Sequence, residues 1–213
     1  MRTTSDGLIV RGGRSVPYIV PWDSEVAGPE SELAVDVAGP EPRLAYTGVP
    51  RPTDRGFGFL WARMSSSPGV GRPLYRAMHA SRQYMCMYGM RCQLCGGPAA
   101  RNDQGWLFLD WRTQQDPDDW PEGTLTAQPP LCEGHARQAL EQCPHLRQGS
   151  PVVLRVRSPR VWGASGALYT LTSNGWSHDE GEIALHKDDG RRHGLLASNL
   201  VRQLVGVSVA DLS

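Results

Sequence analysis

The stretch Cys92-Gln-Leu-Cys95-Gly96, followed after a longer insert by Cys132-Glu-Gly-His135, decides the fold of this chain. Each segment offers two metal-ligating side chains at short spacing, and two such half-sites are what one tetrahedral zinc ion requires. The glycine directly after Cys95 gives the backbone the freedom for a tight turn that aims both thiolates at one ion. The sequence therefore predicts one structural Zn2+, bound by Cys92, Cys95, Cys132 and His135.

Two further metal-capable side chains, Cys143 and His145, are reserve candidates for this site. On a continuous helix Cys143 would lie about 16 Å from Cys132 along the axis, at a rise of 1.5 Å per residue. That separation favours His135 as the fourth ligand and Cys143 as a small buried residue. The competing assignment has Cys143 or His145 as the fourth ligand in place of His135. A set of reduced cysteines without metal is a further alternative.

The residues between and after the half-sites predict how the ligands are held. The aromatic and aliphatic run 105–111 follows the turn-like Asn102-Asp-Gln and predicts the second strand of a β-hairpin. Residues 133–142 are mostly good helix formers, so Cys132 should begin a helix and His135 should fall in its first turn. A cysteine turn, a hairpin and a helix that carries the second ligand pair is the plan of a treble-clef zinc finger.

We predict an α+β fold, with short strands and two or three helices around this central treble-clef-like finger. Residues 1–213 should form a single compact unit, with residues 26–42 as an acidic, Gly/Pro-rich loop and residues 89–147 as the zinc-finger subdomain. A helix is expected to begin at Ser198, and residues 161–162 and 166–172 should be separate strands with a glycine-containing loop between them.

A second helix is predicted over residues 72–88. Leu74, Met78, Met85 and Tyr88 form an apolar stripe at helical spacing, which we expect to be buried. On the other faces of this helix three arginines form a basic surface that we take as the candidate contact with a nucleic acid or a protein partner: Arg72, Arg76 and Arg82. Residues 51–100 carry seven basic residues and one acidic residue, whereas the whole chain has 22 of each and no net charge. Because dedicated DNA-binding proteins usually carry a clear positive excess, direct DNA contact stays an open question, and a solvated helix face neutralised by the acidic loops is the alternative interpretation.

Four segments carry a resemblance to known proteins: Cys92-Gln-Leu-Cys95-Gly-Gly-Pro-Ala99, Trp120-Pro-Glu-Gly123, Pro129-Pro-Leu-Cys132 and Cys143-Pro-His-Leu-Arg147. The chain resembles, over residues 56–169, a group of largely uncharacterised proteins of streptomycetes and their phages. The second half-site of that group is Cys-x-x-Cys, so His135 departs from its pattern, although imidazole also ligates zinc. The resemblance implies a zinc-finger fold and suggests a recombination directionality factor, an accessory protein that binds a large serine integrase and switches it towards excision.

The motifs of several enzyme classes are missing from the sequence. The insert between Cys95 and Cys132 contains no histidine to act as the base of an HNH-type nuclease, and three cysteines and one histidine leave no open position on zinc. No apolar run is long enough to be a signal peptide or membrane span, so we expect a cytoplasmic protein of a bacterial host cell. We therefore expect a non-catalytic regulator that acts through protein contacts; the alternatives are a DNA-binding transcriptional regulator and a divergent nuclease dependent on Asp110.

Overall fold

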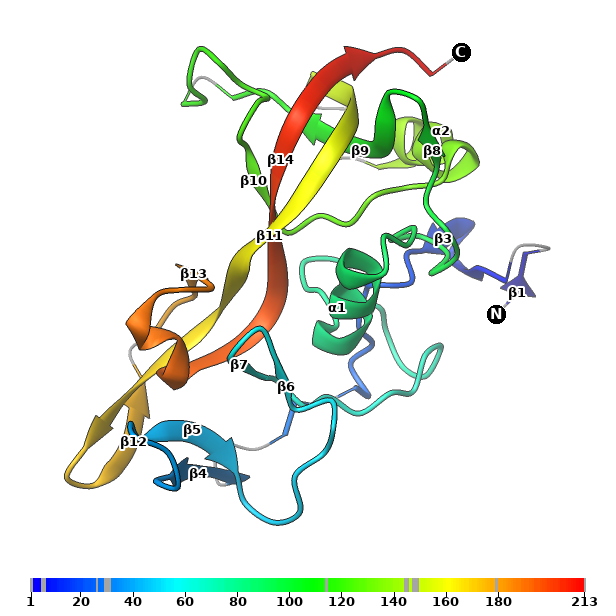
Figure 1. The fold of residues 1–213 in the computed structure, drawn as a ribbon. Helices are drawn as coiled ribbons and strands as arrows, with labels where there is room; N and C mark the ends of the chain where they lie inside the picture. Colours follow the sequence, from blue (N-terminus) through cyan, green and yellow to red (C-terminus); the bar gives the residue numbers. More distant parts are fainter. Residues whose placement is uncertain are drawn as a thin grey trace. The chain divides into compact units, whose positions relative to one another are not determined.

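The computed structural model has an α+β fold, and the residues that it describes form mostly strands, with two α-helices (Figure 1). It describes residues 2–4, 7–25, 27–28, 32–113, 115–143, 146, 150–178 and 180–212. The expected α+β class is therefore confirmed, but the expectation of short strands is wrong for Pro151–Thr172 and Leu195–Ala210, which are 22 and 16 residues long.

Contacts between backbone segments divide the chain into two compact units, where we expected one. Unit 1 contains Met1–Val20, Arg82–Val161 and Arg202–Ser213, and unit 2 contains Pro21–Ser81 and Trp162–Val201. The reason is that two long strands, β11 (Pro151–Thr172) and β14 (Leu195–Ala210), run through both units and build a separate core in each. Phe108, Leu154, Val156 and Leu204 form one buried cluster in unit 1, while Leu44, Leu60 and Tyr169 form another in unit 2.

Unit 1 combines an N-terminal sheet, both helices and one end of the main sheet. Its elements, besides its parts of the two long strands, are β1 (Arg2–Thr3), β2 (Ile9–Arg11), β3 (Arg14–Val16), α1 (Ala80–Tyr88, whose first two residues belong to unit 2), β8 (Arg101–Asn102), β9 (Gly105–Trp111), β10 (Leu125–Thr126) and α2 (Glu133–Gln142). Strands β8 and β9 form the predicted hairpin, and β9 pairs antiparallel with β11. The predicted subdomain 89–147 therefore lies inside a larger unit that also contains the N-terminal strands and the last part of β14.

Unit 2 is built from short strands against the other ends of β11 and β14. Its elements are β4 (Leu33–Asp36), β5 (Arg43–Tyr46), β6 (Arg55–Gly56), β7 (Phe59–Trp61), β12 (Gly175–His178), β13 (Ile183–His186) and the 3-10 helix η2 (Gly190–Gly194). Strand β7 pairs parallel with β14, and β12 and β13 each pair antiparallel with β11. The prediction of a loop over residues 26–42 was wrong for residues 33–36, which form β4 and pair with β5; residues 26 and 29–31 lie outside the described residues.

The loop expected at residues 163–166 is not present, because β11 continues through it as one strand of 22 residues. A Cβ atom added at Gly163 would lie 1.9 Å from the Leu185 carbonyl oxygen of β13, and one at Gly166 would lie 2.0 Å from the Leu196 carbonyl oxygen of β14. These glycines therefore mark positions where a neighbouring backbone approaches closely. Close approach of another backbone is a common reason for glycine within a strand.

The helix expected from Ser198 was also wrong, because this segment is part of β14. Val201, Val205, Val207 and Val209 are β-branched and stand at odd-numbered positions, which suits a strand with its two-residue side-chain period. The helical spacing of Leu200, Val201, Leu204 and Val205 is explained instead by burial of both faces of this strand in the middle of the sheet.

The predicted helix over residues 72–88 is shorter, and its buried face is different. Residues 72–79 are not helical, because Pro73 pairs with Trp22 and the Leu74 amide donates to the Pro21 carbonyl oxygen (2.8 Å). Within α1, Met85 and Tyr88 are 45% and 59% exposed, so the expected buried stripe faces solvent there. The helix buries its opposite side, which includes Arg82, Gln83, Cys86 and Met87.

Candidate metal centre

The turn that carries Cys92 and Cys95 has the geometry that its sequence predicts. The Cys92 amide donates to the Gly97 carbonyl oxygen and the Gly96 amide donates to the Cys92 carbonyl oxygen, both at 2.7 Å. Gly96 has a φ angle of +70°, which a side chain would strain. A Cβ atom at this position would also lie 3.1 Å from the Tyr18 ring. Both observations confirm the need for glycine directly after the second cysteine.

The second half-site lies at the start of α2, as predicted. Cys132 is the residue that precedes the helix, and its carbonyl oxygen accepts the first helical hydrogen bond, from the Ala136 amide (2.9 Å). His135 is buried in the first turn. The amide groups at a helix N-terminus carry partial positive charge, so a thiolate at Cys132 is stabilised there.

Backbone hydrogen bonds join the two half-sites to each other and to β9. The Gln93 amide donates to the Pro130 carbonyl oxygen (3.0 Å), the Ala100 amide donates to the Leu131 carbonyl oxygen (2.8 Å), and the Leu131 amide donates to the Leu107 carbonyl oxygen (3.0 Å). The segment before Cys132 is thus held between the cysteine turn and the hairpin. These hydrogen bonds position the two half-sites relative to each other.

Cys92, Cys95, Cys132 and His135 are brought together, and their ligand atoms all lie within 4.8 Å of one another. The Nδ1 atom of His135 is 3.7 Å from the Cys92 sulfur and 3.0 Å from the Cys132 sulfur. Zinc–sulfur bonds of about 2.3 Å and a zinc–nitrogen bond of about 2.0 Å place tetrahedral neighbours about 3.6–3.8 Å apart. The first distance matches and the second has to open slightly, so the four side chains could hold one metal ion.

The charge of the thiols in this group depends on whether a cation is bound. Burial raises the pKa of the Cys92 and Cys95 thiols. A divalent ion at the centre of the group would reverse this effect, because it binds thiolates and stabilises them against protonation. The described cysteines are all free of disulfides, so their sulfur atoms are available as ligands.

Among the described residues, the other cysteines do not join this group. Cys143 follows the last turn of α2, and its amide donates to the Ala139 carbonyl oxygen (2.9 Å). Cys86 is fully buried in α1, its thiol donates to the Cys92 carbonyl oxygen (3.7 Å), and burial raises the pKa of this thiol to about 12. The other reserve candidate, His145, lies outside the described residues.

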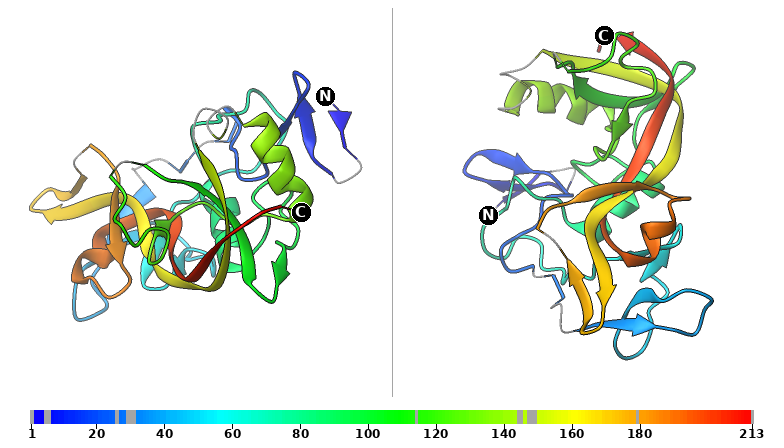
Figure 2. Two further views of the ribbon diagram at one scale, coloured as in Figure 1. Left: turned by 90° about the horizontal axis from the view of Figure 1, so that it is seen from above. Right: turned by 90° about the vertical axis from the view of Figure 1, so that its left-hand side faces the viewer.

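The sequence did not reveal that the N-terminal segment packs on the metal centre. The Tyr18 amide donates to the Leu94 carbonyl oxygen (2.8 Å), and the Gln138 side-chain amide of α2 donates to the Ser15 hydroxyl (2.8 Å). Both views of Figure 2 place the blue N-terminal strands beside α2. These contacts join residues far apart in the chain, and the single local signal is Gly96, whose missing side chain makes room for the Tyr18 ring.

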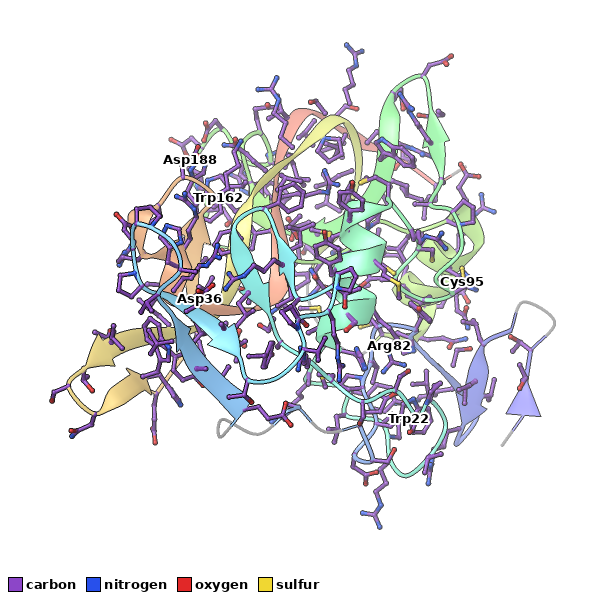
Figure 3. The ribbon with its side chains drawn as sticks, turned by 60° about the horizontal axis from the view of Figure 1, so that its bottom comes forward. Trp22, Asp36, Arg82, Cys95, Trp162 and Asp188 are labelled. Atoms are coloured by element: carbon purple, nitrogen blue, oxygen red, sulfur yellow. The ribbon has the colours of Figure 1, made fainter. Side chains whose placement is uncertain are left out.

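The three arginines proposed as a contact surface do not share an exposed helix face. Arg72 and Arg76 are exposed but precede α1, in a segment without helical structure. Arg82 is only 5% exposed; its guanidinium donates to the Val20 carbonyl oxygen (3.2 Å) and lies 5.8 Å from the centre of the Tyr18 ring. Figure 3 labels Arg82 together with Cys95 in unit 1. The role of Arg82 is therefore structural, because its charged group is buried against the N-terminal segment.

The sequence matches no known protein family and no curated protein, and the structure matches no solved structure. In the part of the chain that the structure describes, no helix combines the length and apolar character needed to cross a membrane.

The ligand assignment predicts a pattern of thiol reactivity. In protein loaded with zinc, iodoacetamide should modify Cys143 first, because Cys92, Cys95 and Cys132 would be ligands and Cys86 is buried with a pKa of about 12. Mass spectrometry of tryptic peptides, with and without a chelator, measures this order. Protection of Cys143 together with rapid modification of Cys132 would contradict the assignment.

Proposed function

We propose that this chain is a non-catalytic regulatory protein that acts through protein contacts, and that one structural Zn2+ stabilises its unit 1. The observation that carries this proposal is the group of four ligand atoms within 4.8 Å. Three thiolates and one imidazole fill a tetrahedral zinc site completely, so water has no position on the ion from which it could be activated. Such a site contributes folding energy and does not supply a reactive centre.

The elements around the ligands support zinc and a treble-clef arrangement. The cysteine turn is followed by the β8–β9 hairpin and then by α2, which carries the second ligand pair. Thiolate-rich tetrahedral sites select zinc among the common divalent ions, while calcium and magnesium prefer oxygen ligands. Metal analysis of purified protein should find one equivalent of zinc, and Co2+ substitution should give the absorption of a tetrahedral thiolate site.

The exposed side of α1 supports the idea that the protein binds another protein. Met85 and Tyr88 are 45% and 59% exposed, and the ring of Tyr84 stacks on that of Tyr88 with 5.7 Å between centroids. Aromatic residues and methionine are enriched in protein interfaces relative to other surfaces. The absence of net charge on the chain is compatible with a partner that is recognised mainly by such contacts.

The resemblance to proteins of streptomycetes and their phages gives the partner a concrete identity, a large serine integrase, for which this chain would be a recombination directionality factor. Co-purification with the cognate integrase, and recombination assays on the integration and excision substrate pairs, test this assignment. We expect excision to be stimulated and integration to be inhibited. No binding and no effect in either direction would remove the integrase as the partner.

A double substitution on the exposed side of α1 tests whether this surface contacts the integrase. Met85→Ser together with Tyr88→Ser should weaken integrase binding at least about tenfold, because truncation of an interface hot spot, a class enriched in tyrosine, costs about 2 kcal/mol or more. The matched control is Val209→Ser, which removes a 63% exposed apolar side chain from β14 and should leave binding unchanged. Equal binding by both variants would show that the exposed side of α1 is not the contact.

Neither alternative function gains a specific observation from the structure. The DNA-binding reading used Arg72, Arg76 and Arg82, and Arg82 is buried. The nuclease reading used Asp110, whose carboxylate accepts a hydrogen bond from the Trp111 amide (2.8 Å). Burial raises the pKa of the Asp110 carboxyl, which disfavours the charged form that would bind a catalytic metal ion. We therefore do not put forward a second function.

A further inference from the structure

Arg155 is a buried cation on the side of the sheet that faces the metal centre. It lies on β11 opposite Leu107 of β9, and Val153, two residues earlier, lies opposite Leu109. Residues two apart in a strand share a face. Val153, Leu107 and Leu109 belong to the buried cluster that also contains Cys92, so Arg155 emerges on that same face.

The charge of Arg155 is poorly balanced by its protein neighbours. Its Nη2 atom donates to the Glu133 carboxylate (2.9 Å), but the arginine side chain is 6% exposed and the glutamate side chain is 53% exposed. The Nη1 atom is buried and has no hydrogen-bond partner among the described residues. A buried guanidinium with one exposed partner and an unsatisfied nitrogen is costly, so a further negative group nearby would be expected to compensate it.

The metal centre would supply that negative charge. Glu133 directly follows the ligand Cys132 and is the first residue of α2, so its contact with Arg155 holds the guanidinium beside the helix start that carries two ligands. Three thiolates and a neutral imidazole around a divalent cation carry a net charge of −1. We propose that Arg155 is a positioning residue for this site: it compensates the negative charge of the thiolate-bound ion and holds the N-terminus of α2, and thereby slows loss of the metal.

This inference rests on the proposed zinc site, and the experiment separates the two. Metal analysis of the unmodified protein comes first, because absence of zinc there would refute the site itself. The second measurement is the rate at which zinc passes from folded, zinc-loaded protein to an excess of a chromogenic chelator. The third is the absorption spectrum of Co2+-loaded protein, which reports the ligand geometry and would not change through a loss of packing elsewhere.

Arg155→Met should release zinc at least about tenfold faster than the unmodified protein, in the range found when outer partners of metal ligands are removed. Arg155→Lys keeps the charge and should release zinc at a rate between the two. Glu133→Gln removes the ion pair that holds the guanidinium beside α2 but keeps the Arg155 charge, so it should also release zinc at a rate between those of the unmodified protein and Arg155→Met. It also tests the proposal in a protein that keeps the buried arginine, should Arg155→Met fail to fold.

Arg202→Met is the matched control. Arg202 is also buried in unit 1, but its guanidinium donates to the carbonyl oxygens of Met87 (2.9 and 2.7 Å) and Tyr88 (3.3 Å) at the end of α1. This variant should lower the stability of the protein without changing the Co2+ spectrum. The proposal would be overturned if Arg155→Met and Arg202→Met accelerated zinc release equally. It would also be overturned if Arg155→Met and Arg155→Lys released zinc at the rate of the unmodified protein. Faster release from Glu133→Gln than from Arg155→Met would also overturn it, since Glu133 would then be the group that matters.

Discussion

Replacement of Cys92 by serine is expected to abolish zinc binding and to unfold unit 1 under conditions in which the unmodified protein is folded. Structural zinc sites bind with apparent free energies of about 10–16 kcal/mol at neutral pH, which is as large as the whole stability of a typical domain. Cys92 is fully buried, and the backbone around it connects the N-terminal segment, the hairpin and α2. Cys132→Ser should have the same effect. Metal analysis and circular dichroism before and after addition of a chelator measure both results.

Two variants serve as controls for the ligand assignment. Cys143→Ser removes a half-buried thiol at the end of α2, and His145→Ala removes the other reserve candidate; both should retain one equivalent of zinc. His135→Ala should lose it. Retention of zinc by Cys92→Ser, or its loss from either control, would require a different set of ligands.

The parts of the fold that could be predicted from the sequence depend on local chemistry. The spacing of Cys92, Cys95, Cys132 and His135 is set by the ion that they would share, and the helix over residues 133–142 follows from helix-forming residues after a ligand. The turn at Gly96 was predictable because the cysteine turn itself requires a positive φ angle there. Each half-site, the helix and the turn are recognised from a few neighbouring residues, and the two half-sites are then related by the one ion that their ligands can share.

The parts that could not be predicted depend on contacts between distant segments. Helical periodicity gave Met85 and Tyr88 a common face, but it does not say whether that face is buried, and α1 instead buries the side with Arg82. The cost of burying Arg82 is offset by Val20 and Tyr18, more than 60 residues earlier in the chain. The division into two units has the same origin, because it follows from which strands pair along β11 and β14.

The close approach of β13 to β11 makes Gly163→Ala the change with the largest expected effect on unit 2. The new methyl group would lie 1.9 Å from the Leu185 carbonyl oxygen and 2.9 Å from the His186 Cα atom, so the backbone of β13 would have to move. Gly163 pairs directly with His186, and the displacement would break this pairing and expose Leu185, which is buried. We expect a loss of about 3 kcal/mol or more, within the range of severe steric changes in a core.

Gly190→Ala is the control within the same unit, because a Cβ atom there meets no other atom within 4 Å and should change stability by less than about 1 kcal/mol. Urea unfolding gives the two free energies, and hydrogen exchange followed by mass spectrometry shows whether the amides of β13 lose protection first. If Gly163→Ala were as stable as Gly190→Ala, the glycine would not be required by the neighbouring backbone. The interruption of β11 at residues 163–166 that the sequence suggests would then be the better description of this segment.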